Sequence, residues 1–310
     1  MKNKEYVAAL DIGTSKIVAM AARKNENGSL TLLASEKEPS ENCIRRGYIY
    51  NADMTVIKIN RIIRKLNEQL KNRSLPPLER IYVGIGGQSI HTEWYSIKKA
   101  INEQVTQELL DEIEQEIAEY DPESTEIPEI LSPEFYVDGE LEENPKGTIG
   151  AVIEARYPLI VNNQSLKKRL ISVLEHKISI IGFNIAPIAT AEAVLTKANK
   201  ESGCALVELG AGVTYLSIYK DDRLKHLVTI PLGASTITKD ISSLGVSEKE
   251  AEELKIKYGS ALIESDNDGK IAQREELKEL KDFGEAIEAR SDEIIANINA
   301  QIENSGYKSA

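Results

Sequence analysis

The sequence predicts an α/β fold with a duplicated core, and three observations predict it. The segment Leu10-Asp11-Ile12-Gly13 returns 197 residues later as Val207-Glu208-Leu209-Gly210. Each copy is an apolar strand pattern that ends in a carboxylate and a glycine and continues into a second alternating strand. Segments with helical periodicity lie between and after these strand pairs. The chain has 310 residues, which is enough for about two domains.

The first half opens with predicted strands. Residues 6–10 and 16–22 have strand patterns on either side of a turn at residues 11–15. Asn27-Gly28 is a strong hairpin signal, and it precedes the apolar run 30–34. The chain therefore begins with strands joined by tight turns.

A helix is predicted next, because apolar residues recur at helical spacing over residues 59–70. They are Ile59, Ile62, Ile63, Leu66 and Leu70, and the other face carries Lys58, Arg61, Arg64 and Lys65. Residues 81–85 then form a buried strand that runs into Gly86-Gly87. We interpret Gly84-Ile85-Gly86-Gly87 as a turn at a strand end, because no helix pattern follows it to make a dinucleotide-binding fingerprint.

The charge of the chain is unevenly distributed. Residues 101–145 contain 16 acidic residues and no Lys or Arg, so the rest of the chain carries a net charge of +4. A helix over 105–119 and short strands at 135–137 and 149–155 predict a small α+β subdomain here. It is either a solvated acidic face or a surface that meets a basic surface on another copy or partner.

The remaining elements follow from similar patterns. Ser165 caps a helix to about residue 176, and residues 178–185 form a strand. The second half has strands at residues 205–208, 214–219 and 224–231, and it is mostly helical after Gly233. Ser247 caps a helix over 248–258, and Ile287, Ile294, Ile295, Ile298 and Ile302 mark a long helix before Gly306.

Composition excludes several classes of protein. Lys and Arg total 38 and Asp and Glu total 50, a net charge of −12, which is unlike a general nucleic-acid binder. Two cysteines and three scattered histidines exclude a disulfide scaffold and a histidine-rich zinc site. No signal-peptide pattern and no run of 18 apolar residues occurs. We therefore expect a soluble cytoplasmic protein.

The two repeated turns form the candidate site. If the two halves face each other, their backbone N–H groups could clamp a polyphosphate from both sides. The residues concerned are Gly13, Thr14, Ser15 and Lys16 in the first turn and Gly210, Ala211, Gly212 and Val213 in the second. Asp11 and Glu208 could hold Mg²⁺ through water, and Lys16 would supply a positive charge to phosphate.

Several motifs resemble one family. Asp11-Ile12-Gly13-Thr14-Ser15-Lys16 resembles the phosphate-1 motif of the actin, Hsp70 and sugar-kinase superfamily. Further stretches, in order, resemble the bacterial cell-division family FtsA: 84–88, 133–138, 144–147, 233–241 and 251–259. The resemblance runs from about residue 6 to about residue 307.

The resemblance implies an actin-like ATPase core that binds ATP and Mg²⁺. It implies that Gly233 lies at the nucleotide and that Glu252 and Lys255 meet the adenosine from one helix face. It also implies a division of the chain. The parts are a first core subdomain (1–87 plus 162–195), an inserted acidic subdomain (88–161), the start of a second core subdomain (196–235) and an α-rich subdomain (236–310).

The sequence departs from the family pattern at the second turn. Glu208 stands where aspartate is usual, Val213 where threonine is usual, and Tyr215 where the residue is often polar. The longer Glu208 side chain moves its carboxylate by about 1 Å, and a displacement of that size costs up to about 10²-fold in rate. We expect the glycine amides to retain ATP binding, with Asp11 and Glu208 supporting at most weak hydrolysis.

A second departure concerns the C-terminus. In the family, the helix that ends near Tyr307 is followed by a strand and a glycine-rich turn that closes the nucleotide pocket, and then by an amphipathic membrane helix. The sequence shows neither, which predicts a C-terminally truncated form. We expect an incomplete second-half sheet with an exposed edge, and no membrane binding by this chain alone.

By resemblance, the function is that of an ATP-binding cell-division adaptor. Such proteins bind FtsZ through the second-half α-rich subdomain, self-associate through the inserted subdomain, and link the FtsZ ring to the inner membrane. Two alternatives stay open. One is an ATPase or phosphotransferase of the same superfamily, and the other is a nucleotide-independent structural protein with a degenerate site.

Overall fold

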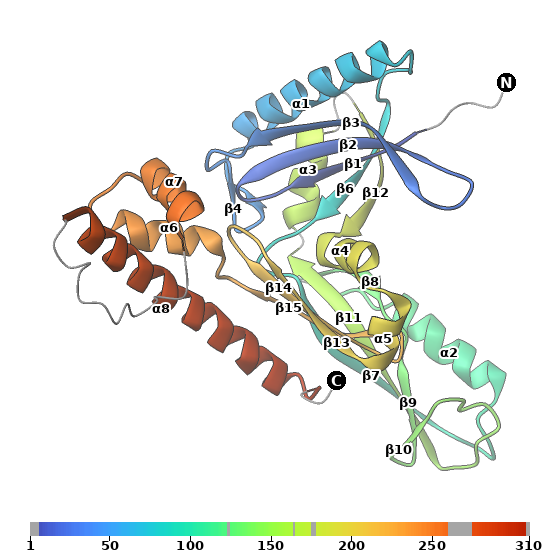
Figure 1. The fold of residues 1–310 in the computed structure, drawn as a ribbon. Helices are drawn as coiled ribbons and strands as arrows, with labels where there is room; N and C mark the ends of the chain where they lie inside the picture. The colour runs from blue at the N-terminus through green and yellow to red at the C-terminus, as the bar shows by residue number, and fades with distance from the viewer. Residues whose placement is uncertain (1–5, 123–124, 164, 175–177, 260–274, 308–310) are drawn as a thin grey trace.

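A five-stranded sheet forms the centre of the first half. The computed structural model describes residues 6–122, 125–163, 165–174, 178–259 and 275–307. The sheet has the order β12-β6-β1-β2-β3, with β1 (Val7–Ile12), β2 (Lys16–Lys24), β3 (Leu30–Pro39), β6 (Arg80–Ile85) and β12 (Ser179–Ile185). β1, β2 and β3 pair as antiparallel neighbours, whereas β1, β6 and β12 run parallel. Helices α1 (Ala52–Asn72) and α3 (Ser165–Leu174) pack against this sheet (Figure 1).

The predicted helix α1 is confirmed, but its basic face is not free. Lys58 is only 3% exposed and donates to Glu41 at 2.8 Å. Arg61 and Lys65 pair with Glu38 at 3.2 and 3.0 Å. Hydrogen bonds from Lys65 and then Arg61 outweigh burial and hold the pKa of Glu38 below its usual range. These three cations anchor α1 to carboxylates of β3 and the loop after it.

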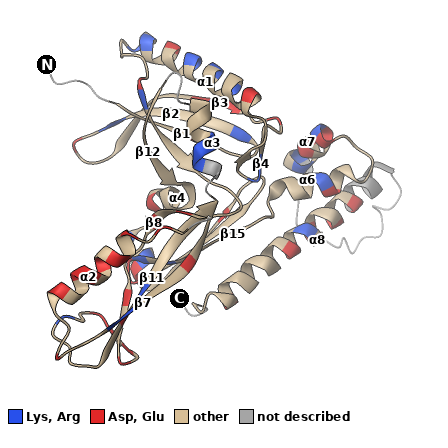
Figure 2. Ribbon diagram, turned by 180° about the vertical axis from the view of Figure 1, so that it is seen from behind, with Lys and Arg blue, Asp and Glu red and all other residues tan. Residues whose placement is uncertain are grey.

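The acidic insert is a separate layer with its own core. Its sheet has the order β10-β9-β11-β7, and β8 also pairs with β11. The bounds are β7 (His91–Ala100), β8 (Thr125–Ile130), β9 (Glu134–Val137), β10 (Glu140–Glu142) and β11 (Val152–Asn163). Helix α2 (Gln107–Ala118) buries Ile113 and Ile117 in this core. Acidic residues on α2 and basic residues on α1 lie far apart on the molecule (Figure 2).

One predicted strand of the insert was misplaced. The pattern at residues 149–155 predicted a short strand, whereas β11 extends from Val152 to Asn163. Ile149 is 81% exposed and lies before the strand. β11 is long because β7 pairs with it along ten residues and β8 and β9 share its other side. That pairing depends on distant segments, which a local pattern does not report.

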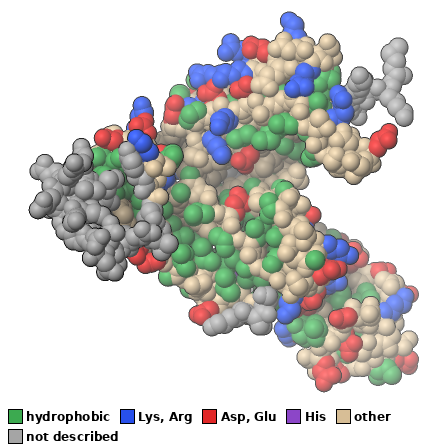
Figure 3. Space-filling view, in the orientation of Figure 1, with side chains coloured by type: hydrophobic (Ala, Val, Ile, Leu, Met, Phe, Trp, Pro, Cys, Tyr) green, Lys and Arg blue, Asp and Glu red, His purple; other side chains and the backbone are tan. Residues whose placement is uncertain are grey.

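The second half contributes a three-stranded antiparallel sheet. Its order is β13-β14-β15, with β13 (Cys204–Leu209), β14 (Thr214–Lys220) and β15 (Arg223–Ile230). Helices α4 (Ala186–Val194) and α5 (Lys197–Ser202), which were not predicted, connect the halves and pack on β14. On the outer strand β13, Val207 and Leu209 are 40% and 52% exposed. Hydrophobic side chains gather over the middle of the molecule, where β14 and β15 lie (Figure 3).

Three helices follow the second sheet. They are α6 (Ala234–Ser242), α7 (Glu248–Tyr258) and α8 (Glu275–Asn304). The predicted cap of α7 is confirmed, since the Ser247 side chain accepts from the Glu250 N–H. Arg290 of α8 donates to both carboxylate oxygens of Asp240 of α6, at 2.6 and 3.0 Å. Within the described residues, none of the helices is long and apolar enough to cross a membrane.

Strand β15 ties the second half to the insert. The Leu227 N–H donates to Thr92 Oγ1 at 2.8 Å, and Thr229 Oγ1 donates to the Ile90 carbonyl at 2.6 Å. Lys225 pairs with Glu134 at 3.0 Å, and both side chains are largely shielded, at 13% and 20% exposure. These contacts therefore fix the insert against the second half of the molecule.

Candidate functional site

The two repeated segments form the same turn. In the first, the Gly13 N–H donates to the Lys16 carbonyl at 2.9 Å, and in the second, the Gly210 N–H donates to the Val213 carbonyl at 3.0 Å. The strand pairs that lead into them match as well, since Ile12 faces Ile17 and Leu209 faces Thr214. Each of these positions recurs after the same interval of 197 residues. The sequence repeat is therefore also a structural repeat.

The structure brings the two turns into contact. A Cβ atom built on Gly212 would lie 2.6 Å from the Thr14 Oγ1 atom and 2.8 Å from its methyl carbon. Only a residue without a side chain allows this approach. Thr14 and Gly212 therefore define where the first half meets the second at the candidate site.

Two carboxylates lie behind the turns. The pKa of Asp11 is raised, first by burial of its carboxylate and then by the negative charge of Glu208, while Lys16 opposes the shift. Part of Asp11 remains open to solvent, although protein atoms surround its carboxylate. Glu208 Oε2 is buried and accepts no hydrogen bond from any described residue. Paired carboxylates with an unused oxygen fit Mg²⁺, which in proteins is held by one or two carboxylates, water and phosphate oxygens.

The remaining residues of the first turn are held by neighbouring backbone. Thr14 Oγ1 accepts from the Gly47 N–H at 3.1 Å. The Ser15 carbonyl accepts from the Ser40 N–H at 2.9 Å, and Ser40 Oγ donates to the Gly13 carbonyl at 2.7 Å. The side chains of Ser15 and Lys16 are exposed, so both can reach a ligand in solution.

The second turn rests on the start of α6. A Cβ atom on Gly233 would lie 2.6 Å from the carbonyl oxygens of both Gly210 and Ala211. The Ala234 N–H donates to Gly210 and the Ser235 N–H donates to Ala211, at 2.9 and 2.8 Å. Gly233 therefore supports the turn through close backbone packing. The first N–H groups of α6 donate to carbonyls of the second turn.

Val213 contributes only its backbone to the second turn. Its side chain is 5% exposed, and its carbonyl accepts the hydrogen bond that closes the turn. An apolar side chain offers phosphate no donor.

Glu252 and Lys255 lie on α7 and face α6. Lys255 Nζ donates to Glu252 at 2.6 Å, to Thr238 Oγ1 at 2.8 Å and to the Ala234 carbonyl at 3.2 Å. Burial acts to raise the pKa of Glu252, but hydrogen bonds from Lys255 and Thr238 outweigh it, so the pKa is lowered. Lys255 thus reaches the residue that follows Gly233, at the edge of the second turn.

Sequence reasoning missed the role of Tyr215. It was noted only as a departure from the family pattern, yet its side chain is 7% exposed and its hydroxyl accepts from the Gly87 N–H at 2.7 Å. A Cβ atom on Gly86 would also lie 2.7 Å from that hydroxyl. The glycines at the end of β6 were the sequence signal for this contact, because a strand glycine often marks a place where another part of the chain approaches closely.

Comparison with known proteins relates the chain to cell-division proteins. Residues 205–301 match the family model described as Cell division protein FtsA. The FtsA of Porphyromonas gingivalis is 32% identical over 303 residues, and that of Bacillus subtilis is 28% identical over 320 residues. These alignments cover 94% and 99% of this chain, but only 62% and 71% of the relatives.

Solved structures confirm the fold. The chain of a PilM-PilN type IV pilus biogenesis complex matches with a TM-score of 0.64 at 14% identity, covering 97% of this chain and 77% of that one. The ethanolamine utilization protein EutJ from Carboxydothermus hydrogenoformans matches with a TM-score of 0.51 at 12% identity, covering 97% and 72%. The predicted actin-like α/β fold is confirmed.

Proposed function

Because this chain is a relative of the FtsA cell-division proteins and has the actin-like fold, we propose that it is an ATP-binding adaptor of bacterial cell division. The observation that carries ATP binding is the contact between the two repeated turns at Thr14 and Gly212. Backbone N–H groups at such turns bind anions. Two turns that meet across the two halves supply a phosphate clamp from both sides.

Different residues of the chain would bind different parts of the nucleotide. Ser15 and Lys16 are exposed beside the first turn and can donate to phosphate oxygens, with Lys16 as a point charge. Glu252 and Lys255 lie at the edge of the second turn, where they can meet the sugar and base. Asp11 and Glu208 would hold Mg²⁺, which neutralises phosphate charge when bound. The absence of a donor at Val213 favours binding with slow hydrolysis.

Removing the Asp11 carboxylate is expected to weaken ATP binding. In calorimetric titrations with Mg²⁺ and ATP, the wild-type chain should bind with micromolar affinity. Asp11→Ala should weaken binding at least tenfold, which is about 1.4 kcal/mol. Asp53→Ala, which removes an exposed carboxylate in the first turn of α1, serves as the control and should bind like wild type. Equal affinity of wild type and Asp11→Ala would exclude this site, and no binding by wild type would favour a nucleotide-independent protein.

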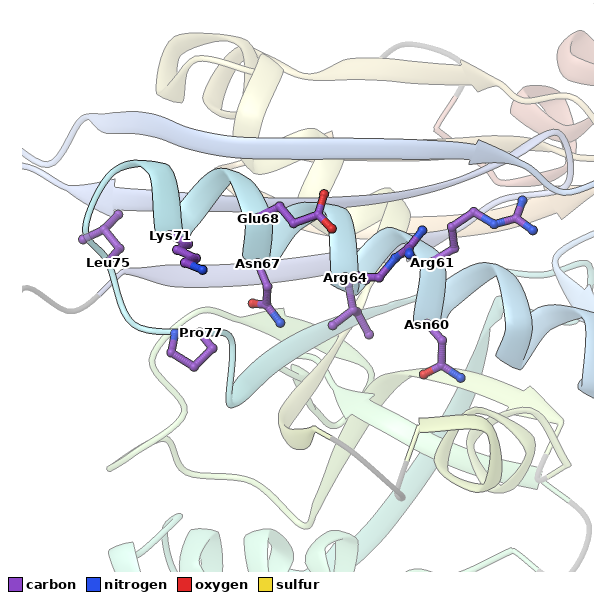
Figure 4. A pocket seen from close by; sticks show the side chains of 9 residues that line it. Asn60, Arg61, Arg64, Asn67, Glu68, Lys71, Leu75 and Pro77 are labelled. Carbon is purple, nitrogen blue, oxygen red and sulfur yellow. The ribbon is translucent and has the colours of Figure 1, made fainter.

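We also propose that copies of the chain associate through the acidic insert. On α2, Glu112 and Glu114 are exposed. The outer side of α1 has a groove of about 850 Å³, lined by Asn60, Arg61, Ile63, Arg64, Asn67, Glu68, Lys71, Leu75 and Pro77 (Figure 4). The groove contains Arg64 and Lys71 as well as Arg61, which is paired with Glu38, and one carboxylate, Glu68. Charge complementarity between the acidic helix and Arg64 and Lys71 supports a head-to-tail contact between two copies.

This contact predicts self-association that weakens with salt. The screening length falls from about 30 Å at 0.01 M to about 8 Å at 0.15 M ionic strength. The weight-average sedimentation coefficient should therefore drop over that range. Arg64→Glu in the groove should lower it already at low salt, whereas Lys249→Glu on exposed α7 makes the same charge change elsewhere. The contact would be refuted if the sedimentation coefficient does not change with salt. It would also be refuted if Arg64→Glu and Lys249→Glu lower the coefficient equally.

The remaining part of the proposal concerns FtsZ. We propose that the α-rich subdomain, residues 236–310, binds FtsZ and that the protein links the FtsZ ring to the inner membrane. The relation to FtsA supports this assignment. Co-sedimentation of the chain with polymerised FtsZ measures the contact, and a chain that stays in the supernatant regardless of FtsZ would contradict it.

A further inference from the structure

A closed path of contacts runs through Tyr215 and joins the two halves behind the candidate site. Thr14 touches Gly212, Thr14 accepts from Gly47, Gly47 packs on Gly87, and Gly87 donates to Tyr215, which lies three residues after Gly212. A Cβ atom on Gly47 would lie 2.4 Å from the Gly87 α-carbon. The path therefore links both turns to each other by two routes, one direct and one through Tyr215.

One contact in this path depends on a single atom, the hydroxyl oxygen of Tyr215. It comes from β14 of the second half, and it accepts from a backbone N–H of the first half at 2.7 Å. This bond spans 128 residues of sequence and is buried. Leaving a buried N–H without an acceptor costs more free energy than the bond itself contributes. Loss of this bond while Gly87 stays buried is therefore unfavourable.

The position of Tyr215 links the bond to the carboxylates. Tyr215 is the cross-strand partner of Glu208 in the β13–β14 ladder. Its pKa is raised strongly, first by burial and also by the charges of Glu208 and Asp11, so the hydroxyl keeps its proton. The hydroxyl thus lies within the electrostatic reach of both groups that would face a bound nucleotide.

We propose that the hydrogen bond between Tyr215 and Gly87 is a latch that holds the two turns together and controls the rate of nucleotide exchange. This role rests on the proposed ATP binding, although the latch itself does not. Tyr215 acts as a positioning residue. When the latch opens, the second turn can move away from Thr14, and the nucleotide can enter or leave.

Tyr215→Phe tests the latch, because it removes the hydroxyl and keeps the ring. Tyr219→Phe is the matched control: Tyr219 lies on the same strand, is 3% exposed, and its hydroxyl has no hydrogen-bond partner among the described residues. In ligand-free protein, hydrogen exchange at the Gly87 amide should accelerate at least tenfold in Tyr215→Phe and stay unchanged in Tyr219→Phe. Equal exchange at Gly87 in all three proteins would overturn the latch.

The exchange rate of nucleotide is the second readout. With a fluorescent ATP analogue in stopped flow, Tyr215→Phe should raise both the association and the dissociation rate several-fold, with a smaller change in their ratio. If hydrogen exchange at Gly87 becomes faster but nucleotide association and dissociation do not, the latch does not control nucleotide exchange. A wild-type chain that binds no analogue would refute ATP binding. Hydrogen exchange at the Gly87 amide would still test whether the latch exists.

A second variant guards against misfolding of the first. Gly86→Ala retains Tyr215 but places a Cβ atom 2.7 Å from its hydroxyl, so the hydroxyl must move away from Gly87. It should reproduce both effects of Tyr215→Phe. If Gly86→Ala folds and leaves Gly87 exchange and nucleotide kinetics as in wild type, the proposal is wrong.

Discussion

Replacing Gly47 by alanine is expected to lower the free energy of unfolding by about 3 kcal/mol or more, from strain and overpacking. Gly47 lies in the tight turn between β4 (Ile44–Arg45) and β5 (Tyr48–Ile49) and has a φ of +78°. A side chain in this left-handed region costs about 1–2 kcal/mol. The new Cβ atom would also lie 2.4 Å from the α-carbon and 2.7 Å from the nitrogen of Gly87.

The neighbouring backbone cannot relieve this clash at low cost. Moving Gly87 strains its hydrogen bond to Tyr215, and moving Gly47 strains its hydrogen bond to Thr14. Overpacking of this kind costs about 1–3 kcal/mol. Since the same backbone joins the two turns, we also expect Gly47→Ala to weaken ATP binding.

Gly28→Ala is the matched control for this prediction. Gly28 has a φ of +82°, but a Cβ atom there would have no neighbour within 4 Å in the described part of the chain. It therefore isolates the backbone strain, and its cost should stay near 1–2 kcal/mol. Urea unfolding followed by circular dichroism measures both variants. Equal losses for the two substitutions would show that the contact with Gly87 contributes nothing.

The second large effect is expected from Lys225→Glu. The pair of Lys225 and Glu134 is 3.0 Å long and mostly shielded from water, and it joins β15 to the insert. Breaking a buried pair by removing one partner costs about 3–5 kcal/mol. Partial exposure reduces this, so we expect a loss of about 2–3 kcal/mol, because two carboxylates would then face each other.

Exchanging the two residues of the pair distinguishes the effect of charge on stability from the effect of side-chain packing. The double variant Glu134→Lys with Lys225→Glu should recover most of the loss, because the attraction returns. Lys197→Glu is the control, since its pair with Glu201 is 74% and 54% exposed and should contribute at most about 1 kcal/mol. Differential scanning calorimetry should show a drop in Tm of about 4–8 °C for Lys225→Glu. A double variant no more stable than the single one would assign the effect to packing.

Much of the fold was predictable because its signals are local. Apolar spacing predicted α1 and the core of the insert helix, and Ser247 predicted the start of α7. Asn27-Gly28 marked the hairpin between β2 and β3. The repeated turns were visible as a repeated phrase, and the structure brings them together. Such patterns work because burial periodicity, capping and turn geometry depend on residues a few positions apart.

The environment of the site was not predictable in the same way. The sequence named Asp11 and Glu208, but only the structure shows that Glu208 Oε2 is buried with no hydrogen-bond partner among the described residues. Lys58 was predicted on the basic face of the helix, and only the structure shows that it is buried against Glu41, which comes from the loop after β3. A charge pattern on a helix does not report which carboxylates other elements bring to it.

The sequence by itself determined the class of fold, the family resemblance and the two glycine turns, since each is encoded in contiguous residues. Only the tertiary structure decided how those turns are held together. Gly47 packs on Gly87 from 40 positions away, and Tyr215 bonds to Gly87 across 128 positions. Contacts at such separations depend on how whole strands and loops pack. Their physical origin is the exclusion of overlap and the need to satisfy each buried N–H group.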